Sequence, residues 1–170
     1  DVLGLNNVVG SSVWSYNSPP SGTVNVVATG AAGTDFMLMV VRSYSGVDTA
    51  APFGTPQSYN PVTSTANMDV TGIGSDTGQL GALCGAARKG TANTTFSADA
   101  TSPVSTERAD ITHSSGSPQI SATVYEENGA SGTIDMRVDM SENVQATAIG
   151  VSILPATASA TRQRSAVFYP

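Results

Sequence analysis

This sequence has little of the residue types that build most catalytic and metal-binding sites. Its 170 residues include one cysteine, Cys84, and one histidine, His113. A single cysteine excludes an intrachain disulfide and a cysteine-rich zinc site. No apolar run reaches the ~20 residues of a membrane-spanning helix, so the sequence predicts no membrane insertion.

Charged residues are also scarce, because they make up 12% of the chain against about 25% in an average globular domain. Seven residues are Lys or Arg, and the formal net charge is -6. These scattered cations form no basic stripe along a phosphate backbone, so nucleic acid is not an expected partner. The length suits one domain with a core of its own.

The longest run of large apolar residues is the stretch 35–46, DFMLMVVRSYSG. It predicts a central strand covered on both faces, with alternate residues from Phe36 to Val40 on one face and Met37 and Met39 on the other. In a two-layer domain only one face of a strand meets the domain's own core. Met37 and Met39 are therefore candidates for a contact with another subunit.

The rest of the chain consists of short alternating segments separated by turn signals. Further strands are expected at 8–16, 23–29, 68–73, 79–89, 94–98, 104–111, 118–125, 133–140 and 143–154. The arms 118–125 and 133–140 are expected to pair as a hairpin around Asn128 and Gly129. A switch of apolar parity in the last strand predicts a β-bulge near 147–149.

These strands, without a helical period, predict an all-β fold. The simplest arrangement is a two-sheet antiparallel β-sandwich, jelly-roll-like, formed by residues 1–155 as a single domain. Residues 156–170 are expected to form a C-terminal arm with a polar stem and an apolar tip, ordered by contact with another chain. Its candidate interface residues are Arg162, Arg164, Val167, Phe168 and Tyr169.

Three stretches carry a resemblance to a known family. In VWSYNSPPSGTVNVVAT an aromatic strand leads through a Pro-Pro-x-Gly turn into a Val-rich strand, in SYSGVDTAAPFG a strand ends before a Pro-Phe-Gly loop, and AIGVSILPA closes the domain. The chain resembles a β-sandwich domain that recurs in phage virion structural proteins and in exported bacterial multidomain proteins. The resemblance implies this fold and a setting on a virion or an extracellular surface. In that family further strands usually precede the aromatic strand, so an open sheet edge is expected.

The titratable residues form no recognisable catalytic arrangement. His113 lies in a Ser-rich loop without the nucleophile elbow or orienting carboxylate of a Ser-His-Asp site. Glu126 and Glu127 with Asp135 and Asp139 have the composition of a glycosidase pair. On the solvent face of a hairpin they are instead expected to be solubilising charges. We expect no enzyme activity and no cofactor.

The loops carry the candidate residues for metal and sugar binding. Asp48 and Asp76 lie in glycine-flanked turns, where Asp caps its own backbone, and no dense acidic loop supplies the about six to eight oxygens of a calcium site. Aromatic residues in strands, such as Trp14, are expected in the core. Phe53 and Tyr59 lie in a long loop and are the candidates for contact with a glycan.

The leading hypothesis is a non-enzymatic structural protein of a virion, such as a phage capsid decoration, head spike or tail component. Its expected partners are other copies of itself and other virion proteins. The alternative is a carbohydrate-binding or adhesion module on a phage or bacterial surface, with a host surface glycan as partner. Exposed aromatic residues in the loop 47–67 and saturable glycan binding would favour the alternative.

Overall fold

The computed structural model describes residues 2–5, 9–16, 21–22, 24–29, 37–76, 78–89, 94–98, 105–113, 119–129 and 132–156. Within these residues every regular element is a β-strand, and every strand pair is antiparallel. The all-β class predicted from the sequence is therefore confirmed. The described part of the chain contains no helix long and apolar enough to span a membrane.

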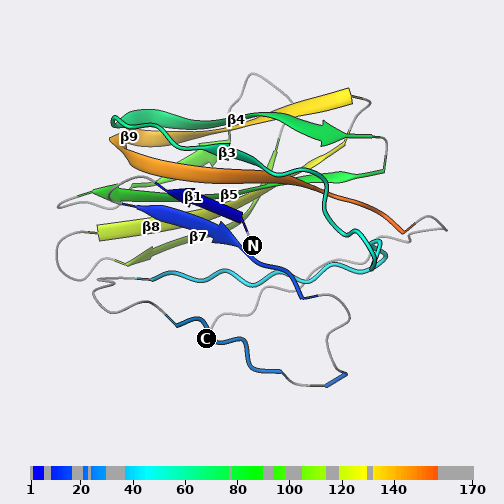
Figure 1. Ribbon diagram of the computed structural model, residues 1–170. Helices are drawn as coiled ribbons and strands as arrows, with labels where there is room; N and C mark the ends of the chain where they lie inside the picture. Colours follow the sequence, from blue (N-terminus) through cyan, green and yellow to red (C-terminus); the bar gives the residue numbers. More distant parts are fainter. Residues whose placement is uncertain are drawn as a thin grey trace.

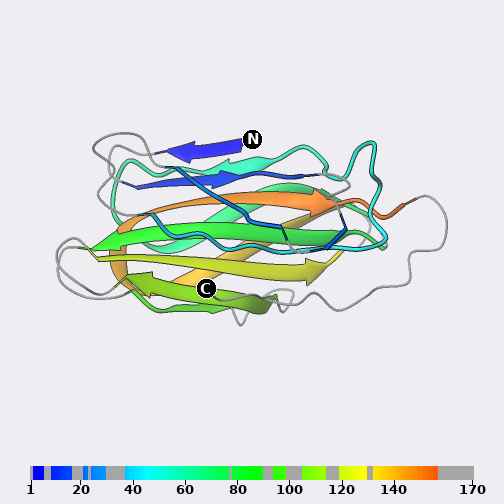
Figure 2. The same ribbon diagram turned by 90° about the horizontal axis from the view of Figure 1, so that it is seen from below.

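The strands are β1 (Val2–Leu5), β2 (Gly10–Val13), β3 (Gln57–Tyr59), β4 (Thr65–Ser75), β5 (Leu80–Lys89), β6 (Phe96–Ala98), β7 (Thr106–His113), β8 (Gln119–Asn128) and β9 (Gly132–Ile153). β1 and β2 form a two-stranded sheet. The other strands form a seven-stranded sheet with the order β3-β9-β5-β8-β7, and β4 and β6 also pair with β9. In Figure 2, orange β9, green β5, yellow-green β8 and green β7 lie in this order.

β9 is the strand around which the fold is built. Its first part pairs with β4 and β6, and its later part pairs with β5 and β3. Between these parts the register against β4 jumps from Asp139 to Val144 while β4 moves only from Asn67 to Thr65. Figure 1 shows that β9 bends, so that its yellow first part lies beside β4, above β5 and β8. The two expected strands 133–140 and 143–154 are one bent strand.

The main core lies between β4 with the first part of β9 on one side and β5, β8 and the later part of β9 on the other. Glycines on β5 and β9 let these layers approach, because a Cβ at Gly81, Gly85 or Gly150 would collide with a core side chain. The fully buried core residues include Met68, Ile73, Leu83, Tyr125, Met136 and Val138.

The opposite face of the later part of β9 is covered by residues from the N-terminal third. Phe53 and Tyr44 pack against a small cluster formed by Ala82, Val151 and Ile153. All residues from 146 to 153 are buried as a result. The change of apolar parity in this strand therefore reflects burial on both faces. The predicted β-bulge near 147–149 is wrong, because the register between β5 and β9 is continuous there.

The predicted hairpin between 118–125 and 133–140 is also wrong. Both segments are strands, but β8 pairs with β5 and β7, and β9 pairs with other strands. β8 is almost entirely buried from Ser121 to Glu127. Because β5 and β7 pair with the two edges of β8, no edge of β8 is left to pair with β9.

The predicted central strand 35–46 does not form. Within its described part, residues 37–46 lie outside every strand, and so do residues 24–29 of the predicted strand 23–29. The expected alternation of burial is nevertheless present, because Met37 and Met39 are exposed while Leu38 and Val40 are half-buried. Apolar composition indicated extended chain here, but it did not determine a pairing partner.

Candidate functional site

Large exposed hydrophobic side chains are concentrated in one part of the sequence. Of the eight in the described residues, seven lie between positions 14 and 39, and the other is Val62. We call these seven the N-terminal surface: Trp14, Tyr16, Val24, Val26, Val27, Met37 and Met39. Single exposed apolar residues are normal in soluble monomers, but their concentration within this part of the sequence makes it the candidate interaction site.

The backbone of this surface is extended but unpaired. Val24 to Thr29 reads VNVVAT, a sequence of high β-propensity, and all six residues are exposed. Between described residues, no backbone hydrogen bond joins 24–29 or 37–41 to another segment. Figure 1 shows the blue trace of 24–29 and the cyan trace that begins at Met37 below the strands, outside the sheet.

The N-terminal surface is electrically neutral. None of the described residues from Val9 to Val41 is charged, although the whole chain has a formal net charge of -6. The described residues of this surface therefore offer apolar contacts and no charged group.

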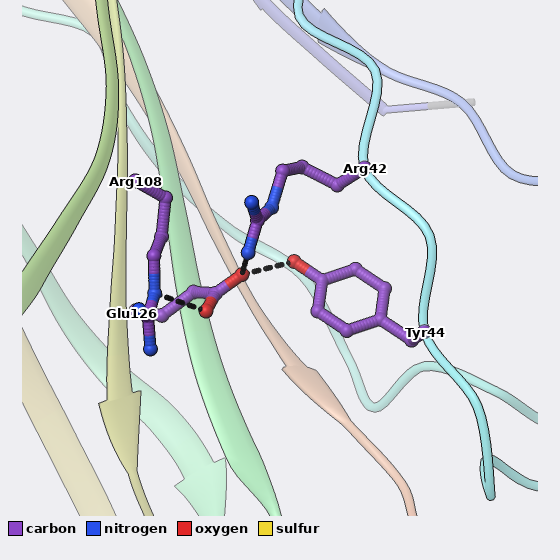
Figure 3. Close-up of polar contacts among 4 residues, drawn as sticks. All are labelled: Arg42, Tyr44, Arg108 and Glu126. Carbon is purple, nitrogen blue, oxygen red and sulfur yellow. Dashed lines mark hydrogen bonds and ion pairs between the residues drawn. The ribbon is translucent and has the colours of Figure 1, made fainter. Parts of the chain in front are cut away.

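The buried carboxylate of Glu126 on β8 holds Arg42 and Tyr44 against the sheet (Figure 3). Arg42 and Tyr44 come from the extended segment after Met39, while Arg108 comes from β7. Glu126 Oε1 accepts hydrogen bonds from Arg42 Nη2 at 3.0 Å and from the Tyr44 hydroxyl at 2.6 Å. Its Oε2 accepts one from Arg108 Nε at 2.7 Å. We call these four residues the Glu126 cluster.

The pKa values of Arg42 and Tyr44 are both raised in the Glu126 cluster, so both side chains remain hydrogen-bond donors. Glu126 is 4% exposed, so its carboxylate would be costly to bury without the two guanidinium groups. Burial acts to lower the pKa of Arg42, but the Glu126 charge and the hydrogen bonds outweigh it, so the pKa is raised. Burial and the hydrogen bond to Glu126 raise the pKa of Tyr44, so its hydroxyl remains a donor.

The same environment makes the single thiol unreactive. Burial, together with the nearby Glu126 charge, raises the pKa of Cys84 to about 11. Because the thiolate is the nucleophilic form, Cys84 is almost entirely protonated at neutral pH. It is therefore a poor nucleophile at neutral pH.

Glu127, the next residue of β8, has the opposite environment. It is 5% exposed, and neither of its carboxylate oxygens has a hydrogen-bond partner. Burial raises the pKa of Glu127 to about 6. The sequence-based assignment of Glu126 and Glu127 to a solvent face is wrong, because β8 lies inside the sheet.

The other acidic candidates lie apart and are occupied by structural contacts. Asp135 accepts a hydrogen bond from the Gly72 amide at 2.7 Å, and Asp139 pairs with Arg137 at 3.0 Å. Asp48 caps its own turn through the amide of Ala50. His113 is the last residue of β7. Among the described side chains, no group of three or more His, Cys, Asp or Glu is placed to hold a metal ion.

The two glycan-contact candidates are half-buried and packed within the chain. Phe53 bridges to Ile153 and packs against the small cluster on β5 and β9. Tyr59 packs against the main core, and its hydroxyl donates to Thr65 Oγ1 at 3.2 Å. The strongly exposed aromatic residues are instead Trp14 and Tyr16, at 72% and 75%. The expectation of a core position for Trp14 is wrong.

The structure places the interface candidates in two groups. Met37 and Met39 are 50% and 47% exposed and belong to the N-terminal surface. The C-terminal candidates lie outside the described residues, and they are Arg162, Arg164, Val167, Phe168 and Tyr169.

Sequence reasoning missed the Glu126 cluster and most of the N-terminal surface. Glu126 lies 84 positions from Arg42 and 82 from Tyr44, and no local spacing indicates such a contact. The alternation of Val24 and Val26 with polar neighbours was visible, but it was interpreted as a paired strand.

Comparisons with protein-family models, with characterised proteins and with solved structures find no match for this chain.

Proposed function

We propose that this chain is a non-enzymatic structural protein of a virion that acts through subunit–subunit contacts, as a phage capsid decoration, head spike or tail component. The observation that supports this proposal is the neutral N-terminal surface, where seven large apolar side chains are exposed. Full burial of a Val or Met side chain contributes about 1.5–3 kcal/mol, so covering this surface is a sizeable source of association energy. Other copies of the chain and other virion proteins are the proposed partners.

The proposed architecture is a two-sheet, jelly-roll-like sandwich. In it, β4, β6 and the first part of β9 form one layer, and β3, the later part of β9, β5, β8 and β7 form the other. The core cluster that joins β4 and β9 to Leu83 and Tyr125 supports this arrangement. Such a rigid double layer would carry the N-terminal surface outward for assembly on the exterior of a particle.

The test is the assembly state of the purified chain. We expect native mass spectrometry and sedimentation at tens of micromolar to show oligomers, and Met37→Asp or Met39→Asp to weaken them at least tenfold. A buried unpaired carboxylate at the contact would be responsible. Thr71→Asp, which adds the same charge at an exposed position on β4, is the control and should assemble normally. A wild-type chain that stays monomeric would contradict the proposal.

The alternative function is a carbohydrate-binding or adhesion module, and the exposure of Trp14 and Tyr16 favours it. The indole N–H of Trp14 donates to Ser12 Oγ at 3.1 Å, which orients the ring. Exposed aromatic rings supply large, rigid contact areas. Saturable binding to a glycan panel that is lost in Trp14→Ala but kept in Phe53→Leu would support this function over the structural one.

A further inference from the structure

The geometry points to one mode of association, which rests on the proposed function: residues 24–29 form an unpaired β-edge that pairs, antiparallel, with the same residues of a second copy of this chain. The outward position of this segment, its backbone and its lack of charge lead to this inference.

The first argument is the backbone. Residues 24–29 are extended, all six side chains are exposed, and no backbone hydrogen bond joins them to another described segment. An extended segment whose N–H and C=O groups have no partner among the described residues can act as a template for strand addition, and its main-chain hydrogen bonds then supply affinity. The chain does not protect this edge with Lys, Pro or any charge, unlike β7, which carries Glu107, Arg108 and a register irregularity.

The second argument identifies the partner. The described residues from Val9 to Val41 carry no charge, so they do not select an acidic or basic protein. In a chain of net charge -6, this neutral surface is where two copies approach with the least like-charge repulsion. Antiparallel pairing of a segment with its own copy is isologous, as in most dimers, and its two-fold axis sets either Val26 or Val27 of one copy opposite the same residue of the other. Identical valines then meet across the pair.

The third argument is that the chain is fixed to the sheet at residues that follow this edge in the sequence. The chain leads from residues 24–29 to Arg42 and Tyr44, which the buried carboxylate of Glu126 fixes to β8. Anchoring reduces the conformational entropy that association must remove. The Glu126 cluster therefore acts as a positioning contact for this surface and not as part of it.

Backbone pairing is tested with proline, which keeps an apolar side chain but removes the N–H donor. Val26→Pro and Val27→Pro are made singly, because consecutive N–H groups of an extended strand point to opposite sides and one of them faces the partner. Val26→Ala and Val27→Ala are the matched controls. We expect one proline variant to raise the dimer dissociation constant at least tenfold relative to its alanine control, measured by sedimentation.

A second measurement needs no variant. Amide hydrogen exchange of the wild-type chain, diluted and concentrated, is expected to show protection of residues 24–29 only in the concentrated, assembled sample. If the chain assembles while these amides exchange at the dilute rate and both proline variants match their alanine controls, the inference is wrong and the proposed function stands. A chain that is monomeric at every concentration overturns both.

Discussion

Replacing Glu127 with glutamine is expected to stabilise this protein at neutral and alkaline pH. The carboxyl group is buried on β8 without a hydrogen-bond partner, and burial raises its pKa from 4.5 to about 6. Its neutral form is therefore favoured in the folded chain. The folded protein binds the proton more tightly than the unfolded chain, so Glu127 opposes folding wherever it ionises.

The size of the effect follows from the two pKa values. A rise from 4.5 to about 6 is worth about 2 kcal/mol, since one pKa unit corresponds to about 1.36 kcal/mol. The wild type has no penalty from Glu127 below about pH 4.5, where both states are protonated. The loss in free energy of unfolding grows as the pH rises. It is complete above about pH 6, where Glu127 is ionised in the folded protein as well. Glutamine has nearly the shape of protonated glutamate and does not titrate.

The assay is urea unfolding of wild type and Glu127→Gln from pH 4 to 8. We expect equal stability near pH 4 and an advantage of about 2 kcal/mol for the variant at pH 8, or a melting temperature roughly 4–8 °C higher. Subtracting the two curves removes the titrations that both proteins share. Asp76→Asn, which removes the same charge at an exposed position, is the control for the change in net charge. A constant difference between wild type and Glu127→Gln across this range would refute the reasoning.

Two other predictions follow from the described contacts and the sequence. Arg42→Ala should destabilise the fold by about 3 kcal/mol in urea unfolding, because it removes a largely buried cation from Glu126. Arg108→Ala, whose side chain is 40% exposed, should cost about 1 kcal/mol or less, and equal losses would argue against this ranking. Truncation after Ala156 should weaken assembly in sedimentation, because the arm that ends in Phe168 and Tyr169 is proposed to contact another chain. Unchanged assembly and melting temperature would refute that role.

Much of the strand content was predictable from local pattern. The turn around Gly78 separates two strands as expected, and they are β4 and β5. In the expected strand 133–140, the apolar residues Ile134, Met136 and Val138 alternate with polar ones, and all three are buried. A period of two residues is a property of the strand itself, so it can be read without knowledge of the neighbours.

The choice of strand partner was not predictable in the same way. The turn signal at Asn128 and Gly129 suggested a hairpin, yet β8 and β9 pair with other strands. Pairing depends on which strand edges remain free when distant segments meet. Because β9 bends, its first part pairs with β4 and β6 and its later part pairs with β5 and β3. Likewise, residues 24–29 have a strand sequence but no described partner within the chain. Local pattern indicates extended backbone, whereas the fold determines whether that backbone is paired.

Glu126 and Glu127 show why the candidate site was harder to predict than the strands. They are adjacent, equally buried and chemically the same, but successive side chains of a strand point to opposite faces. Glu126 faces the N-terminal third and meets Arg42, Tyr44 and Arg108, while Glu127 faces the other way and has no hydrogen-bond partner. One residue therefore fastens the segment that leads to the N-terminal surface, and the other reduces stability above about pH 6. Glu126 attaches the N-terminal third to the sheet, while Glu127 beside it carries a charge without a partner among the described residues. This combination fits a chain in which that attachment matters more than maximal stability of the isolated domain.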